Sequence, residues 1–335
     1  MGHRGDYEAS VIRDSLTRKQ LVESHRAQNS HHAWLSHTYG SFHILNAAGP
    51  AAYACHEGIM VFRNMEPRLL AMAFRDRKAY IDEKAFYGTL FAHGSMDPLS
   101  KLSFILARIP RDLQCIDVLR ETIKDPLQLC SALSLFFARL IETRGALDLW
   151  LARDAPNHGK VAVERSSNLF KFVDNVAQCM QSRNVFDNDA AMWAMITHWH
   201  YRSKLLIEIL ALYDLMSALA WPGTVGPSNT IAALRSQLRN ELSSCITNIV
   251  RSAETALSDQ SPKTWWTAVF LVSIPIRSVL RFLQQDSEMM KKHKGEYEWG
   301  LAIAKRQRPV TSRFSVGEYA ADAIVGKVDG LPCIA

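Results

Sequence analysis

The cysteines of this sequence show no paired spacing. Six cysteines are spread over 335 residues, whereas a disulfide-rich secreted scaffold places its cysteines much closer together. We therefore expect reduced thiols, in the core or at the surface. The six are Cys55, Cys115, Cys130, Cys179, Cys245 and Cys333.

A long hydrophobic run is also missing. The longest apolar stretch, Trp265 to Ile276, is about a dozen residues, contains Pro275 and is too short to span a bilayer. The first residues carry no apolar segment typical of a secretory signal, and Asp6 stands where N-myristoylation requires Ser or Thr. These absences predict a soluble cytoplasmic or nuclear protein that has no membrane partner.

The charge balance gives no nucleic-acid footprint. Lys and Arg total 39 against 33 Asp and Glu, and the resulting formal charge of +6 is scattered along the chain. A nucleic-acid-binding protein more often concentrates its basic residues in a stripe or an arm. The densest basic stretch, 290–294 with 305–308 nearby, is interpreted as a solvated helix end.

Motifs that hold metals, cofactors or nucleophiles are absent. The sequence has no His-Glu-x-x-His, Cys-x-x-Cys, Gly-x-Ser-x-Gly, phosphate-loop or dinucleotide-binding pattern. His31, His32 and His37 are one candidate metal cluster. His198 and His200 are another, but two residues apart on a helix they point roughly 200° away from each other. We expect no metal site and no cofactor.

What the sequence does contain is helical periodicity. Its clearest segment, 190–219, repeats apolar residues at three- and four-residue steps, follows possible caps at 187–189 and precedes a Trp-Pro-Gly stop at 221–223. Capping residues also precede prolines at Asp97-Pro98, Asp125-Pro126 and Ser261-Pro262. The other periodic segments are 11–27, 68–80, 98–107, 126–144, 161–181, 229–257 and 262–285.

Alternating strand patterns are not evident, so the prediction is an all-α fold. We expect a single large multi-helix domain over residues 1–310 and a C-terminal tail at 311–335, where mixed residues and three glycines indicate looser packing.

Aromatic residues gather on two of the predicted helices. The bland interpretation is core packing. The alternative is a small-molecule pocket, because an apolar wall with a few convergent polar donors is how such pockets are built. On that interpretation His200 and Tyr201 are the candidate catalytic hydrogen-bond donors. The candidate substrate-binding walls are Trp193, Trp199, Tyr213, Trp265 and Trp266.

Several landmarks resemble the regulatory region of fungal zinc-cluster transcription factors. They are Ala33–Gly40 with its Trp-x-x-His-x-x-Gly pattern, Ala48-Gly49-Pro50, Gly58, Phe62-Arg63, the arginines Arg68, Arg75 and Arg77, Met192–Lys204, and Glu298–Ala302. Together they cover roughly residues 20 to 305. The resemblance implies a helical regulatory domain that senses metabolites or partners. In that family a DNA-binding module holds two zinc ions with six closely spaced cysteines. Only Cys55 lies in the first hundred residues here, so no direct sequence-specific DNA binding is expected.

Two functions remain open at this point. The first is a cofactor-independent enzyme of fungal secondary metabolism, which binds a small apolar intermediate and catalyses its cyclisation or isomerisation, for example a Diels–Alder reaction. Positioning of the reacting ends and a hydrogen bond to a carbonyl would supply the rate enhancement. The second is a transcriptional regulator or ligand-sensing domain without its own DNA-binding module. A homodimer is left open in both cases.

Overall fold

The computed structural model describes residues 31–49, 55–80, 87–88, 96–159, 161–165, 182–219, 229–258 and 265–312. The principal elements, in chain order, are α2 (His31–Ala48), α3 (His56–Asp76), α5 (Pro98–Leu106), α6 (Arg108–Thr122), α7 (Pro126–Arg153), the 3-10 helix η2 (Pro156–Gly159), β1 (Ala162–Arg165), β2 (Ser182–Val185), α8 (Asp189–Leu219), α9 (Asn229–Ser258), α10 (Trp265–Gln285), α11 (Ser287–Lys292) and α12 (Lys294–Ser312). The all-α prediction is confirmed, with one two-stranded sheet added.

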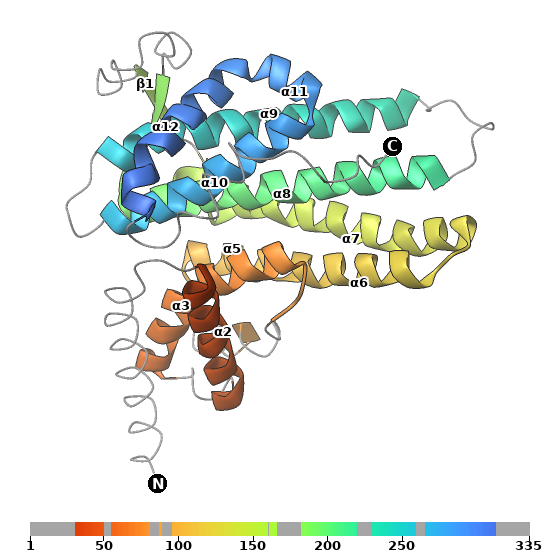
Figure 1. The fold of residues 1–335 in the computed structure, drawn as a ribbon, viewed down its shortest axis with the longest axis horizontal. Helices are drawn as coiled ribbons and strands as arrows, with labels where there is room; N and C mark the ends of the chain where they lie inside the picture. The colour runs from red at the N-terminus through yellow and green to blue at the C-terminus, as the bar shows by residue number, and fades with distance from the viewer. Residues whose placement is uncertain are drawn as a thin grey trace.

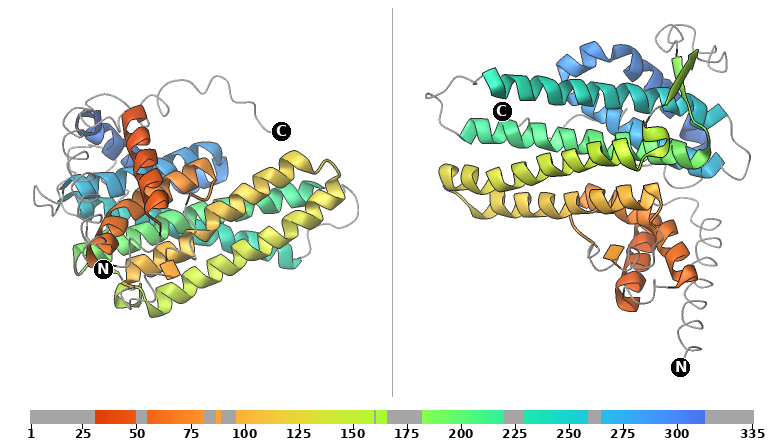
Figure 2. Two further views of the ribbon diagram at one scale, coloured as in Figure 1. Left: turned by 90° about the horizontal axis from the view of Figure 1, so that it is seen from below. Right: turned by 180° about the vertical axis from the view of Figure 1, so that it is seen from behind.

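Four helices, α6 to α9, lie side by side as antiparallel neighbours and form the main layer (Figure 1). Helix α10 packs on α8, α9 and α12, and so covers one face of this layer. Helices α2 and α3 lie on the other side of the molecule, next to α5 and α6 (Figure 2).

The helix starts follow from local side-chain chemistry. Asp97 and Asp125 accept hydrogen bonds from the backbone N–H groups of Ser100 and Gln128, each at 2.8 Å, and a proline occupies the first turn behind each cap. At the start of α8, Asn188 accepts from Ala191 N at 2.8 Å. These caps confirm the sequence prediction for three helices. The predicted cap at Ser261 and the predicted segment 11–27 lie outside the described residues.

Two helical predictions need correction. Helix α7 was expected to end near residue 144 but continues to Arg153, because packing of the buried Leu147 and Trp150 offsets the roughly 1 kcal/mol that Gly145 costs inside a helix. The segment 161–181 was expected to be helical, yet residues 162–165 pair antiparallel with 182–185. Residues 162–165 form a strand because they pair with 182–185, about twenty residues later in the chain. Periodicity within a short segment does not reveal such a distant partner.

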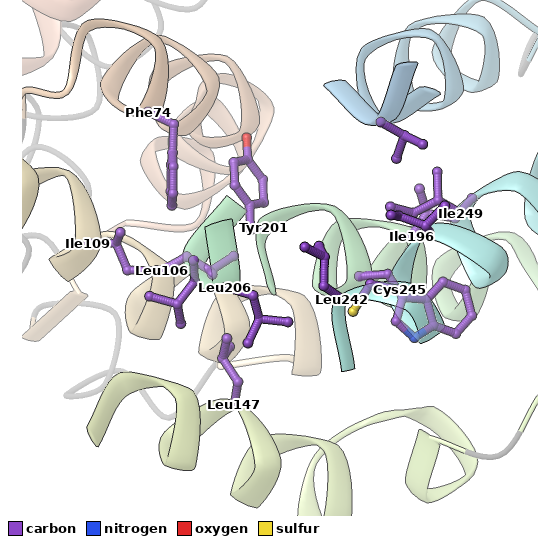
Figure 3. Packing of buried hydrophobic residues seen from close by; sticks show 14 of the residues in the cluster. Phe74, Leu106, Ile109, Leu147, Ile196, Tyr201, Leu206, Leu242, Cys245 and Ile249 are labelled. Atoms are coloured by element: carbon purple, nitrogen blue, oxygen red, sulfur yellow. The ribbon is translucent and has the colours of Figure 1, made fainter. Parts of the chain in front are cut away.

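Helix α8 is the centre of the main core. It buries side chains around its whole circumference, and Leu205, Leu206 and Ile209 are completely inaccessible. Figure 3 shows its side chains meeting residues from α3, α7 and α9. A helix that is apolar on every side is stable only when neighbours cover it completely, and α7, α9 and α10 provide that cover.

A smaller second core lies between α2, α3 and the short segment at Tyr87. Phe62 and Tyr87 are each 1% exposed and meet edge to face, with ring centroids 5.6 Å apart. Met65 and Leu69 complete the buried side of α3. This core joins the main layer through α5 and α6.

An ion-pair network ties α7, α8 and α9 together. The guanidinium of Arg202 on α8 lies 2.6 Å from Asp148 of α7 and 2.9 Å from Glu241 of α9. Arg144 of α7 also pairs with Glu241. Arg202 is only 9% exposed, so these two carboxylates offset the cost of burying its charge inside the layer.

The Arg202→Met variant is expected to destabilise the protein by about 3 kcal/mol, because it removes the shared cation and leaves Glu241 with Arg144 alone. Lys294→Met is the matched control, since Lys294 is 77% exposed and lies 3.9 Å from Glu298 within one helix. Its effect should stay below about 0.5 kcal/mol. Urea denaturation followed by circular dichroism measures both, and equal effects would contradict the role given to Arg202.

Candidate functional site

A cavity of about 350 Å³ lies where η2, the β1–β2 hairpin and the first turns of α8 meet. Seven of its nine lining residues have apolar side chains, among them Val161, Val185, Phe186, Ala191 and Met195. The volume is at the lower end of the range in which small-molecule sites fall, about 300–1,000 Å³.

The rim of this cavity is formed by a turn whose backbone conformation includes two residues with positive φ. Helix α7 ends before Pro156, and Gly159 closes η2 with a positive φ of 72°, where a side chain would collide with Leu151. Asn157 also has a positive φ, of 50°. The chain thereby turns from the end of α7 into β1.

The hairpin is held in place by α9. Asn184, in β2, is 1% exposed and donates its amide to Ser252 Oγ at 2.9 Å and to the carbonyl of Asn248 at 3.1 Å. Thr255 donates to the backbone carbonyl of Asn184. The cavity wall made by Val185 and Phe186 therefore follows directly after a residue fixed to α9.

The cavity has one carboxylate in its lining. Asp187 accepts a hydrogen bond from the side-chain amide of Asn157, and both residues are exposed at the rim. This pair can accept a hydrogen bond from a ligand amine or hydroxyl, or donate one from the Asn157 amide. The described lining contains no Ser, Cys, His or Lys side chain that could act as a nucleophile.

Among the aromatic residues predicted for the site, Trp199 packs near a residue of the cavity lining. Its ring centroid is 6.3 Å from that of Phe186, which lines the cavity, so Trp199 forms the layer behind the wall. Trp193 and Tyr213 are half-buried on α8 and are not in the lining. Trp265 and Trp266 begin α10, but their side chains lie outside the described residues.

The two predicted catalytic residues lie deeper in the protein, away from the cavity lining. His200 and Tyr201 are 3% and 6% exposed, and their ring centroids are 4.7 Å apart. Tyr201 also packs on Phe74 of α3 at 4.6 Å (Figure 3). Burial raises the pKa of the Tyr201 hydroxyl above its ordinary value.

His200 is unusual because neither ring nitrogen has a hydrogen-bond partner among the described residues. Burial, followed by the nearby charge of Lys204, holds the pKa of His200 well below its ordinary value, so the ring is neutral near pH 7. Burying an unsatisfied polar group costs about 1–3 kcal/mol. His200 is therefore the buried group on α8 with the clearest unexplained cost.

His198 has a structural role. It stacks on Trp150 of α7, with centroids 5.1 Å apart and planes 22° apart, and Trp150 donates its indole N–H to the carbonyl of Pro98. Burial, with a smaller contribution from Arg202, lowers the pKa of His198 to about 3. The two histidines thus have different surroundings, as their two-residue spacing predicted.

Sequence reasoning missed two perturbed groups. Lys204 lies over the rings of Phe74 and Tyr201, 5.6 and 5.7 Å from their centroids, and burial lowers its pKa to about 8. Glu66, on α3, is 3% exposed and accepts a hydrogen bond from the Tyr87 hydroxyl at 2.5 Å. Burial raises the pKa of Glu66 to about 8, against the opposing effect of that hydrogen bond. Glu66 belongs to no motif, Lys204 is only the last residue of the Met192–Lys204 landmark, and the tertiary structure alone reveals their burial.

Within the described ranges, no three His, Cys, Asp or Glu side chains gather closely enough to hold a metal ion. Over the same ranges, no helix has the length and apolar character needed to cross a membrane. Comparison with family models, with curated proteins and with solved structures finds no match to this chain. Functional inference therefore depends on the residues themselves.

The raised pKa of Glu66 predicts a specific pH dependence of stability. The folded protein keeps this carboxyl protonated up to about pH 8, whereas the unfolded chain releases the proton near pH 4.5. The stabilisation that the protonated Glu66 carboxyl gives the folded state is thus complete below pH 4.5. The free energy of unfolding should fall as the pH rises from 4.5 to 8. Glu66→Gln removes this fall and should raise the melting temperature at pH 8.

Glu57→Gln is the control for this experiment, because Glu57 is exposed on the same helix. Melting temperatures of the three proteins between pH 5 and 8 make the comparison. If Glu66→Gln and the wild type lose stability in parallel over this range, Glu66 is not the group that titrates.

Proposed function

We propose that this chain is a ligand-sensing regulatory domain that binds a small, mainly apolar metabolite in the cavity between α8, η2 and the hairpin. The observation that carries the proposal is the cavity lining, in which seven of nine residues have apolar side chains and the remaining two, Asn157 and Asp187, form a hydrogen-bonded pair at the rim. Such a lining suits selective binding, because it offers burial for a hydrocarbon body and one anchoring point for a polar group.

The position of the cavity suits a sensing role. Its walls come from the continuation of α7, from a hairpin fixed to α9 and from the start of α8, which are the three helices of the ion-pair network. A ligand that contacts all three walls would stabilise one relative placement of these helices. A ligand changes a conformational equilibrium only through such differential contacts.

The resemblance to fungal zinc-cluster regulators supports the same proposal. Its landmarks Trp34 and Arg75 fall on α2 and α3, and Arg77 is the C-cap of α3. The landmark Met192–Lys204 falls on α8, whose first turns form one wall of the cavity. The 335 residues contain no six-cysteine zinc-binding pattern, so we propose that promoter choice would come from a partner that carries one.

Neighbouring alanines allow a sharp test of the cavity. Ala191 lines it, whereas Ala190 is exposed and does not. With 2-naphthylmethylamine as the probe, Ala191→Phe should weaken binding at least about 10-fold by filling the space, and Ala190→Phe should leave it unchanged. Isothermal titration calorimetry measures the dissociation constants.

A second arm of the same experiment tests the anchoring carboxylate. Asp187→Asn should weaken binding of the amine by about 3- to 10-fold and leave binding of 2-methylnaphthalene unaffected, because only the amine forms a charge-assisted hydrogen bond. Equal affinity of the wild type and Ala191→Phe for the amine would refute the cavity as the binding site.

His200 supports a second candidate, the cofactor-independent cyclase or isomerase. A neutral imidazole can donate one hydrogen bond and accept another, and His200 uses neither capacity among the described residues. With Tyr201 beside it, the ring could polarise a substrate carbonyl or assist a proton transfer in a Diels–Alder-type cyclisation. On this proposal the cost of the unsatisfied ring is retained for activity.

His200→Met is expected to raise the free energy of unfolding by about 1–3 kcal/mol, because it removes two unsatisfied nitrogens from an apolar site. If the protein is an enzyme, the same variant loses conversion of pathway intermediates.

Gene deletion separates the two proposed functions. Falling transcripts of the whole biosynthetic cluster, without conversion by the purified protein, would exclude the enzyme. Altered product stereochemistry with steady transcripts would exclude the regulator.

A further inference from the structure

Helix α7 presents an exposed seam along its outer side. This seam is a row of residues three or four positions apart, all exposed and with one charge among them: Leu127, Ser131, Ser134, Ala138, Glu142, Gly145, Leu149 and Ala152. Leu135 lies directly beside it. The right-hand view in Figure 2 shows α7 along the side of the molecule opposite to α10–α12.

The exposure of this seam is substantial. Leu127, Leu135 and Leu149 are 66%, 60% and 48% exposed, and no atom lies within 4 Å of a side chain that would be added at Gly145. A solvent-facing helix side normally carries mixed charges. Single exposed leucines are ordinary, but three lie on one side of this 28-residue helix, within about 33 Å of its length.

The seam of one copy of α7 fits the seam of a second copy that runs in the opposite direction. If two copies of α7 run antiparallel about a two-fold axis next to Leu140, each residue i faces residue 280 − i of the other copy. Leu135 then faces Gly145, and Leu149 faces Ser131. Leu127 faces Arg153 in the same register and lies beside Ala152. Two of the three exposed leucines therefore meet a small residue, which is how side chains interdigitate between packed helices.

The charges match in the same register. Glu142 is exposed and has no ion-pair partner among the described residues. It would face Ala138 of the second copy and come next to Arg139, which is 45% exposed and pairs with Asp112 of its own chain. The two-fold axis creates this Glu142–Arg139 contact twice. A two-fold interface requires such reciprocity, because residue i contacts j and j contacts i.

We infer that the outer side of α7 is a homodimer interface in which two copies of this helix pack antiparallel. The occupant of the seam is a second copy of this chain. This inference is independent of the ligand-binding proposal, because none of the seam residues lines the cavity. In a regulatory domain, such a pairing would place two cavities in one assembly.

Analytical ultracentrifugation of the full chain tests the interface. The wild type should sediment at twice its 37.8 kDa mass at micromolar concentration. Leu135→Arg should halve the mass with an unchanged circular dichroism spectrum. Met60→Arg is the control, since Met60 is 46% exposed on α3 and the substitution adds the same charge. A wild type that is monomeric at about 100 μM, or a dimeric Leu135→Arg protein, would overturn the inference.

Crosslinking tests the antiparallel register without depending on a destabilising substitution. A mixture of Ala138→Cys and Glu142→Cys chains should form a disulfide between positions 138 and 142 of different chains upon mild oxidation. Ala138→Cys alone should crosslink poorly, because its two copies are offset by four residues along the paired helices. Peptide mass spectrometry identifies the link. An efficient link between position 138 of both chains, without a link between positions 138 and 142 in the mixture, would refute the antiparallel register.

Discussion

The pairing of Arg202 with Asp148 and Glu241 is the constraint on which the rest of this structure depends. A buried guanidinium cannot shift to another rotation of α8 without losing its partners, so the contact fixes how α8 faces α7 and α9. Apolar side chains alone would permit several rotations, because α8 is buried on all sides. The ion pairs select one of them, and the layer of antiparallel helices forms around that choice.

The same placement of α8 determines where a ligand can enter. The first turns of the helix extend beyond the ion-pair network towards η2 and the hairpin, where Ala191 and Met195 form one wall of the cavity. Asn184 holds the opposite wall to α9 through buried hydrogen bonds. On the ligand-sensing proposal, a molecule bound in the cavity would contact elements attached to α7, α8 and α9 and so favour one placement of these helices. The exposed side of α7 contributes no residue to the cavity lining, and we propose that it pairs with α7 of a second copy of the chain.

Three buried titratable groups differ in how the cost of burying them is offset. Glu66 is accommodated by a hydrogen bond from Tyr87 and by protonation. His198 stacks on Trp150, but its Nδ1 has no hydrogen-bond partner among the described residues. His200 has no such compensation among the described residues. Since natural proteins retain uncompensated polar groups chiefly where function or specificity needs them, His200 keeps catalysis as a candidate function beside ligand sensing.

The sequence by itself determined the helical class, the caps at Asp97 and Asp125 and the extent of the central helix, because these depend on interactions between residues a few positions apart. The tertiary structure decided the rest. The short hairpin depends on a distant partner strand, and the cavity depends on Phe186 meeting Met195 across two elements. Sequence periodicity marked the aromatic residues of α8 but could not distinguish Trp199, behind the cavity wall, from Tyr201, packed on Phe74. Rotation of one helix against its neighbours makes that distinction, and it is fixed by long-range contacts that no local pattern records.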